Sequence, residues 1–403
     1  MTDERPGLRG SNLDLVRRRN LALVLRRVHE LGGVSRAVLT RETALNRSTI
    51  AALVAELGQL GLVEETLPEQ TNQVGRPSPT IVPTRRAAAI TVHPELDAAT
   101  ICLVALGGHV LRRERFPTAG VPKPEEVVQI AASAIRGMAI DLHDKLVAGI
   151  GLAVPGLVRE EDGVVTLAPH LEWRDVPLGD MLREATGYVV VAGNDASLGA
   201  IAESIRGAGR GVDDLIYLNG GASGIGGGII AGGVLLGGAS GYAGEIGHTL
   251  VNSAGVECHC GSSGCLETEV SRATLLEALG LASTRADLLE ETLLARIAEP
   301  GHDELRALVD RQLGYLARAL ANVVNSFNPQ LILLGGFLAS LDAAAPGRLG
   351  ELVQSMALAG PREGVVIERA TLGPSIIELG AAEIAFRALI ADPAGSAGGD
   401  EAA

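Results

Sequence analysis

The stretch Cys258-His259-Cys260-Gly261-Ser262-Ser263-Gly264-Cys265 places three thiols close together, and its glycines let the chain fold back on itself. Zinc takes four soft or borderline ligands in a tetrahedron, which three thiolates and one imidazole satisfy. Two histidines can supply the nitrogen: His259 inside the stretch, or His248 upstream of it. A histidine between two ligand cysteines would have to point the same way as both, so His248 is the easier ligand.

We therefore predict a zinc site formed by His248, Cys258, Cys260 and Cys265. Four protein ligands leave no open position for an activated water, so the predicted zinc is structural. The alternative is that the three cysteines are unrelated core residues, as we expect for Cys102 in a predicted strand. With 4 cysteines in 403 residues, a disulfide framework is not expected.

Polar residues surround the cysteine stretch. Glu245 precedes it, Glu267 follows it, and the pair Asn194-Asp195 comes directly after a predicted strand. Carboxylates and amides bind sugar hydroxyls through hydrogen bonds worth roughly 1–3 kcal/mol when charge-assisted. For an isolated glutamate a surface or capping role is the simpler explanation. Their clustering around one metal loop favours a site for hydroxyl groups.

Strands alternate with helices over the larger part of the chain, which indicates an α/β body built around sheets. The strands are expected at residues 90–92, 100–106, 147–154, 189–191, 215–218 and 331–334. The helices are expected at 124–142, 196–207, 303–325 and 380–390.

Two glycine-rich stretches, residues 219–228 and 333–336, follow predicted strands. Backbone N–H groups there can closely approach a phosphate or sugar hydroxyls. Neither is a Walker A loop, because no Gly-Lys-Ser/Thr follows. Tight hairpins are also rich in glycine, so this signal is weak by itself.

The first 84 residues have a different pattern. Apolar residues at helical spacing predict a helix ending at Gly32-Gly33, a second helix capped by Ser35, and a third capped by Asn46 after a tight turn. Three short helices with such a turn are typical of a helix-turn-helix. Arg47, Ser48 and Thr49, at the start of the third helix, are donors suited to bases and phosphates in a major groove.

A β-hairpin is expected after the third helix, with strands at 62–65 and 81–82. Between them, Gly75-Arg76-Pro77 is extended and narrow, and it can place Arg76 in a minor groove. The alternative is an ordinary proline-rich linker. With the helices before it, the segment predicts a winged helix-turn-helix that contacts DNA.

Charge supports this division. Residues 1–86 contain 13 arginines, no lysine and 9 acidic residues, a net charge of +4, whereas the whole chain carries −14. A basic head on an acidic body suits a DNA-binding module whose body stays away from phosphate. No long apolar run and no apolar signal core occur, so we expect a cytoplasmic protein without a membrane span.

Three motifs together resemble the ROK family of repressors and sugar kinases. They are Gly-Ile-Gly-Gly-Gly at 224–228, Gly-Glu-Ile-Gly-His at 244–248 and Cys-x-Cys-Gly-x-x-Gly-Cys-Leu-Glu at 258–267. The resemblance extends over nearly the whole chain, including residues 153–156, 168–169 with 173–174, 194–196 and 328–336.

The resemblance implies a two-lobed, actin-like, sugar-kinase-like body behind the winged helix-turn-helix, with a sugar cleft between the lobes. We expect the head over 1–84, an N-terminal lobe over 85–195 completed by 376–391, a C-terminal lobe with the zinc loop over 196–375, and a disordered tail over 392–403. It also implies that the sugar site is lined by Asn194, Asp195, Glu245, His248 and Glu267.

Kinases of the family use the aspartate corresponding to Asp195 as general base and grip ATP phosphate with Asp-x-Gly-Gly-Thr. Here the equivalent stretch, 93–97, reads His-Pro-Glu-Leu-Asp and lacks the glycines. His93 stands at the aspartate position, and Glu95 would place negative charge near the phosphates. Phosphoryl transfer depends on positioning and charge neutralisation, so we expect no catalysis and a vestigial Asp195.

The leading hypothesis is therefore a sugar-responsive regulator, a repressor of genes for carbohydrate uptake or catabolism, that binds operator DNA as a homodimer or homotetramer. The alternative is an ATP-dependent sugar kinase with an accessory DNA-binding head. A third possibility is a regulator that no longer responds to a sugar.

Overall fold

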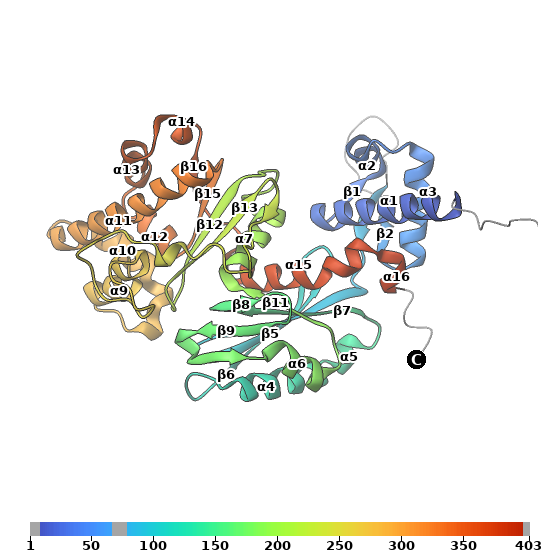
Figure 1. Ribbon diagram of the computed structural model, residues 1–403, viewed down its shortest axis with the longest axis horizontal. Helices are drawn as coiled ribbons and strands as arrows, with labels where there is room; N and C mark the ends of the chain where they lie inside the picture. Colours follow the sequence, from blue (N-terminus) through green and yellow to red (C-terminus); the bar gives the residue numbers. More distant parts are fainter. Residues whose placement is uncertain (1–8, 67–78, 398–403) are drawn as a thin grey trace, which may run out of the picture.

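The computed structural model describes residues 9–66 and 79–397 (Figure 1). Within them the chain forms a small, mainly helical head and a body with two five-stranded sheets and one small sheet. No helix in this part of the chain is long and apolar enough to cross a membrane.

The head contains the three predicted helices, α1 (Arg9–Leu31), α2 (Arg36–Thr43) and α3 (Arg47–Gln59). Ser35 Oγ accepts a hydrogen bond from the N–H of Val38 at the start of α2. Asn46 Oδ1 does the same for Thr49 at the start of α3, at 2.8 Å. Each cap satisfies an N–H that the first helical turn leaves without a partner, so both helix starts follow from the local sequence.

The predicted wing is an antiparallel pair of strands, β2 (Val63–Thr66) and β3 (Thr80–Pro83). A third short strand, β1 (Val34–Ser35), pairs with β3 and was not predicted. Residues 67–78, which include Arg76 and its Gly-Arg-Pro step, lie outside the described residues, so its predicted contact with DNA stays a prediction.

The two five-stranded sheets of the body share one pattern of antiparallel and parallel strands, as expected for an actin-like fold. Each has three antiparallel strands followed by two parallel ones, in the orders β6-β5-β4-β7-β11 and β14-β13-β12-β15-β16. A small sheet β10-β9-β8 extends the first lobe. The first lobe contains β4 (Ala87–Pro94), β5 (Ala98–Ala105), β6 (His109–Pro117), β7 (Leu146–Val154), β8 (Leu157–Arg159), β9 (Val164–Ala168), β10 (Trp173–Val176) and β11 (Val190–Asn194). The second contains β12 (Leu215–Gly220), β13 (Ile225–Ala231), β14 (Val234–Leu235), β15 (Leu331–Gly336) and β16 (Val366–Arg369).

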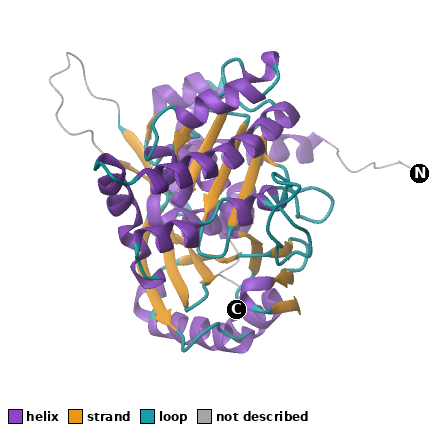
Figure 2. Cartoon of the chain, turned by 90° about the vertical axis from the view of Figure 1, so that its left-hand side faces the viewer, coloured by secondary structure: helices purple, strands orange, loops and turns teal. Residues whose placement is uncertain are grey.

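Helices cover the sheets, which lie between helical layers in Figure 2. The first lobe has α4 (Pro124–Gly137), α5 (Ala139–Leu142) and α6 (Leu178–Thr186). The second has α8 (Leu266–Glu269), α9 (Arg272–Leu279), α10 (Leu289–Ala298), α11 (Asp303–Phe327), α12 (Phe337–Ala343), α13 (Arg348–Met356) and α14 (Ala359–Arg362).

Two further helices lie against each other where the lobes meet. α7 (Asp195–Arg206) packs on β12 and β13 of the second sheet, and α15 (Ile376–Ala391) packs on β4 and β7 of the first. The helices are in close contact, because a Cβ on Gly380 of α15 would lie 2.0 Å from the carbonyl oxygen of Leu198 in α7. The contact between α7 and α15 therefore joins one lobe to the other.

The head is not a separate globule. Apolar residues of α1 and α3 belong to the same buried cluster as residues of β5, β12 and α15, among them Val28, Ile50, Tyr217 and Phe386. Figure 1 shows α15 running from beneath α7 to the head. A change in how α7 and α15 pack can therefore reach the head through buried contacts.

Several expectations need correction. Residues 392–403 were expected to be disordered, but within this range α16 (Pro393–Ala397) is a helix that packs against α1 and α15, and residues 398–403 lie outside the described residues. Composition alone does not reveal that α1 and α15 form a surface on which these residues pack. The single helix expected at 124–142 is divided at Met138 into α4 and α5. Strands β6, β8–β10, β13, β14 and β16 were not predicted, because they lack a continuous apolar run.

We predict that Gly380→Ala destabilises the protein by at least about 1–3 kcal/mol, because the added methyl group would overlap the backbone of α7. The matched control is Gly314→Ala in α11, where an added Cβ has no atom within 4 Å. That control should raise stability by about 0.5–1 kcal/mol through helix propensity. Chemical denaturation measures both, and equal effects of the two substitutions would contradict the packing described.

Candidate functional site

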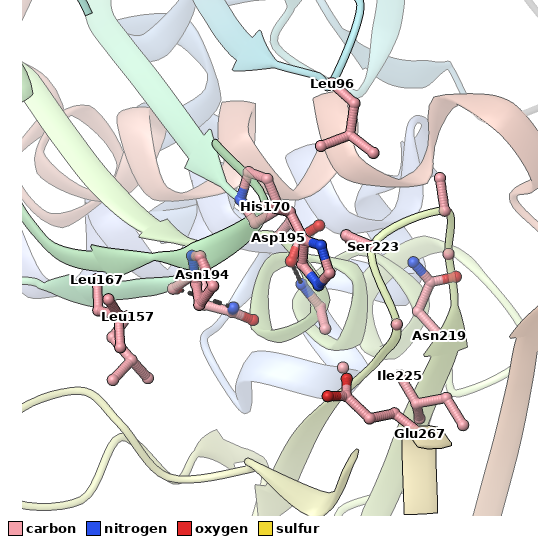
Figure 3. Close-up of a pocket in the computed structure, with 18 of the residues that line it drawn as sticks. Leu96, Leu157, Leu167, His170, Asn194, Asp195, Asn219, Ser223, Ile225 and Glu267 are labelled. Atoms are coloured by element: carbon pink, nitrogen blue, oxygen red, sulfur yellow. Dashed lines mark hydrogen bonds between the residues drawn. The ribbon is translucent and has the colours of Figure 1, made fainter. Parts of the chain in front are cut away.

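A cavity of about 750 Å³ lies between the lobes, in the size range of small-molecule sites. Its wall comes from the ends of β4 and β11, the loop between β12 and β13, and the cysteine stretch. Figure 3 shows Asn194, Asp195 and His170 on one side of this pocket, and Ile225 and Glu267 on another. All five residues expected to bind sugar line it: Asn194, Asp195, Glu245, His248 and Glu267.

Asn194 and Asp195 stand where β11 ends and α7 begins. The Asn194 amide oxygen accepts from the N–H of Ser197 at 3.0 Å, and its nitrogen donates to the carbonyl of Gly156 at 3.1 Å. Asn194 is therefore a helix cap, and one amide hydrogen remains for a ligand. Asp195 accepts from the N–H of Ala196 through Oδ1, so Oδ2 is the oxygen available to a hydroxyl group.

The cavity changes the acidity of its carboxyl groups. Burial raises the pKa of Asp195, and the nearby His93 opposes this rise. Burial also raises the pKa of Glu245, which His248 opposes. Carboxylates held away from water need hydrogen-bond donors, and sugar hydroxyls supply them.

The cysteine stretch brings its thiols to one point beside the cavity. Ligand atoms of His248, Cys258, Cys260 and Cys265 all lie within 4.8 Å of one another. Cys258 Sγ lies 3.7 Å from His248 Nδ1, and Cys260 Sγ lies 3.7 Å from Cys265 Sγ. With bonds of about 2.1 Å to nitrogen and 2.3 Å to sulfur, ligand atoms around a tetrahedral zinc lie roughly 3.5–3.8 Å apart. The four side chains therefore fit a metal of this kind.

A second group overlaps the first. His248, Cys258, His259 and Glu267 also have ligand atoms within 4.8 Å of one another. The two groups differ in chemistry, because the first has three sulfur donors and the second only one. Soft thiolates favour zinc strongly, so the donor set favours the first group. Both groups satisfy the same distance limit, and a metal assay on variants of Cys265 and His259 separates them.

His248 connects the metal group to the cavity. Its Nδ1 faces the thiol of Cys258, and its Nε2 lies 3.9 Å from Glu245 Oε2 in the cavity wall. A metal bound at Nδ1 would hold the ring and fix a proton on Nε2. That proton would be directed toward Glu245 or a ligand.

Glu267 belongs to the second group of possible metal ligands and also reaches the cavity. Its Oε1 accepts from the thiol of Cys258 at 3.2 Å and lies 3.3 Å from His259 Nδ1. Its other oxygen passes close to Gly224, which has a φ of +129° and where a Cβ would lie 2.2 Å from Glu267 Oε2. The glycine thus allows Glu267 to reach the cavity, in a loop that is otherwise the turn of the β12–β13 hairpin.

The turn after β4 forms another part of the cavity wall. His93, Glu95 and Asp97 line it, at the place where the sequence lacks the glycines of a phosphate loop. The sequence predicts that Glu95 places negative charge near a phosphate. Arg115 Nε lies 3.0 Å from Glu95 Oε2 and its Nη2 lies 2.5 Å from Asp97 Oδ1, so part of this charge is offset.

Two cavity histidines were not among the predicted site residues. His170 comes from the first lobe and His259 from the cysteine stretch, and in the cavity wall their rings make an edge contact with centroids 4.8 Å apart. Burial and the neighbouring His259 lower the pKa of His170, and its Nε2 is buried without a hydrogen-bond partner within the described chain. A buried nitrogen of this kind needs a ligand or water.

The predicted DNA-contacting residues lie at the exposed N-terminal end of α3. Arg47 and Ser48 are exposed, and Thr49 is half-buried. The Ser48 hydroxyl donates to Asn46 Oδ1 at 2.7 Å. The helix N-terminus favours phosphate, so this end of α3 suits a groove.

Residues 96–388 match the sequence model of the ROK family. The chain is 27% identical to the xylose repressor of Caldicellulosiruptor bescii, over 95% of this chain and 99% of the relative. It is 30% identical to the DNA-binding transcriptional dual regulator NagC of Escherichia coli K12, over 90% and 91%. Its fold is similar to the crystal structure of a ROK family transcriptional regulator described as a homolog of E. coli MLC protein, with a TM-score of 0.74, 26% identity, and coverage of 94% and 97%.

An enzyme relative matches less of the chain. The glucokinase of Halalkalibacterium halodurans is 33% identical, over 56% of this chain and 72% of the relative. The repressors thus match the chain almost from end to end, whereas this kinase matches little more than half of it.

We predict that Cys265→Ser abolishes metal binding and lowers the melting temperature, whereas His259→Ala retains the metal. Cys265 belongs only to the three-thiol group and His259 only to the second group, so the pair distinguishes them. Elemental analysis of both variants after dialysis, with the melting temperature, is the measurement. Metal lost from His259→Ala but kept by Cys265→Ser would contradict the assignment.

Proposed function

Because the chain belongs to the ROK family, we propose that it is a sugar-responsive DNA-binding transcriptional regulator, and specifically a repressor. The observation that carries the proposal is the extent of the match with regulators, which includes the helical head. The head occupies residues 1–84, and the two lobes divide near residue 195. Genes for carbohydrate uptake or catabolism are the proposed targets.

The effector is a sugar or sugar derivative bound in the cavity between the lobes. The support is the set of carboxylate, amide and imidazole groups that line it, together with the raised pKa of two of those carboxyls. Asn194, Asp195, Glu245, His248 and Glu267 are the proposed sugar contacts. Binding draws the lobes together and shifts the population of closed molecules.

Zinc is the proposed resident metal, held by His248, Cys258, Cys260 and Cys265. When bound, it supplies a fixed geometry rather than a reactive group, because four protein ligands leave no place for a water. His248 would then hold its Nε2 toward the sugar cavity. Asp195 and Glu245 accept hydrogen bonds from sugar hydroxyls nearby.

The DNA partner is a double-stranded operator. Arg47, Ser48 and Thr49 are the proposed contacts in a major groove, and Arg76 in the neighbouring minor groove. In a homodimer or homotetramer, two heads would read half-sites separated by whole helical turns. Lobe closure would change the spacing or orientation of the heads and so the affinity for the operator.

We predict that Asp195→Asn abolishes the response of DNA binding to sugar without abolishing DNA binding. The substitution keeps an oxygen for the Ala196 N–H and removes the charge that a hydroxyl would use. The measurement is binding to the upstream DNA of its own gene, with and without xylose, glucose or N-acetylglucosamine. Asp180→Asn, on the exposed face of α6, is the control.

An unchanged sugar response in Asp195→Asn would mean that the cavity is not the sensor. A wild-type protein that fails to bind this DNA at low salt, with or without sugar, would contradict the function itself.

A sugar kinase is the second candidate, supported by the retained Asp195 and the kinase relative. The stretch 93–97 opposes it, because it lacks the glycines that wrap a phosphate. We therefore predict no turnover above background in an ATP-coupled assay across the same three sugars. Sugar-dependent ATP consumption that Asp195→Asn removes would establish the kinase instead.

A further inference from the structure

A buried cluster of charged residues lies where the head meets the body. It consists of His29 from α1, Arg206 from the end of α7 and Glu383 from α15. The side chains are 1%, 10% and 6% exposed, respectively. We call these three residues the head joint. None of them lines the cavity between the lobes.

The hydrogen bonds of the head joint are specific. His29 Nε2 lies 2.7 Å from Glu383 Oε2, and His29 Nδ1 accepts from the backbone N–H of Gly107 at 2.9 Å. Because Nδ1 accepts there, a neutral ring carries its proton on Nε2, which faces Glu383 Oε2 and also lies 2.8 Å from Arg206 Nη2. The histidine is thus held at both nitrogens, one by the turn after β5 and the other by α15.

Arg206 completes the connection. Its Nε donates to Glu383 Oε1 at 2.7 Å, and Nη1 donates to the backbone carbonyls of Gly107 at 2.8 Å and His29 at 3.2 Å. Burial by itself would raise the pKa of Glu383, but His29 and Arg206 outweigh it and lower that pKa to about 2. The carboxylate is therefore charged at neutral pH. Loss of either partner would leave a buried charge without full compensation.

The two body helices of the joint both begin at the cavity. α7 starts at Asp195 and α15 starts at Ile376, with Ile377 in the cavity wall. α7 then ends at Arg206, and its 12 residues span about 18 Å from the cavity to the joint. α7 packs on the second sheet and α15 on the first, so Arg206 and Glu383 are attached to different lobes. A relative movement of the lobes would displace one of these residues with respect to the other.

We propose that His29, Arg206 and Glu383 are positioning residues that couple the sugar cavity to the DNA-binding head. The proposal rests on the proposed function. In it, α7 and α15 carry lobe closure to the joint, and Arg206 transfers the displacement to α1 through His29 and its carbonyl group. The head shares its apolar core with α15, so a shift at this point reorients α1 and α3 together.

The test compares DNA affinity in the presence and absence of sugar, using the full chain. His29→Gln keeps a neutral donor of similar length, and Arg206→Lys keeps the charge but loses the second arm to the backbone. The DNA is the upstream duplex, and the sugar is whichever of xylose, glucose and N-acetylglucosamine raises the wild-type melting temperature most. Sugar affinity is measured separately by calorimetry.

We expect sugar to change wild-type DNA affinity by about 5- to 150-fold, the usual range for coupled sites. In both variants this change should fall below about twofold, while sugar affinity and sugar-free DNA affinity each stay within about threefold of wild type. If these residues only stabilised the fold, substituting them would lower the folded population. The ratio of DNA affinity with sugar to DNA affinity without sugar would then stay at its wild-type value.

Arg113→Lys is the matched control, because it keeps a charged partner for the buried Glu378. Arg113 of β6 pairs with Glu378, also on α15, at 3.1 Å, but this pair does not contact the head. It should keep the wild-type ratio. If His29→Gln and Arg206→Lys both keep the wild-type ratio of DNA affinity with and without sugar, the proposal is overturned. If the wild-type protein shows no sugar response, the proposed function is contradicted, and with it the role of the head joint.

Discussion

The close packing of α7 against α15 is the constraint on which the rest of the structure depends. The Gly380–Leu198 approach leaves no room for a side chain, so the two helices hold one lobe against the other. Asp195 is positioned at the cavity because α7 begins there, and Arg206 is positioned at the head because α7 ends there. One short helix therefore determines both the sugar-facing carboxylate and the contact with the head.

Buried charges are costly unless every one is paired, and those of the head joint are paired. Glu383 accepts from both His29 and Arg206, and Arg206 also binds two backbone carbonyls. An apolar contact at this point would tolerate many small shifts, because dispersion has little direction. A hydrogen-bonded cluster has few acceptable geometries, which makes it suited to distinguish two arrangements of the head. The cavity and the head therefore belong to one packed unit.

The sequence predicts those features that depend on residues close together in the chain. The caps at Ser35 and Asn46 and the convergence of His248 with three cysteines are of this kind, and the structure contains them. It does not predict contacts between distant residues. His29 and Glu383 are 354 positions apart, and a lone histidine in an amphipathic helix gives no sign of its partner. α16 was taken as part of the tail, because it acquires its surroundings only from the folded body.

We propose that a sugar in the cavity reorients the head on the body. The most direct measurement is the distance between spin labels on exposed positions of the head and the first lobe, such as Arg41 of α2 and Ile140 of α5. Labels carried by unnatural amino acids spare the cysteines, and excess unlabelled chain removes distances between subunits. We expect the sugar that binds in calorimetry to shift this distance distribution. An unchanged distribution at saturating sugar would contradict it.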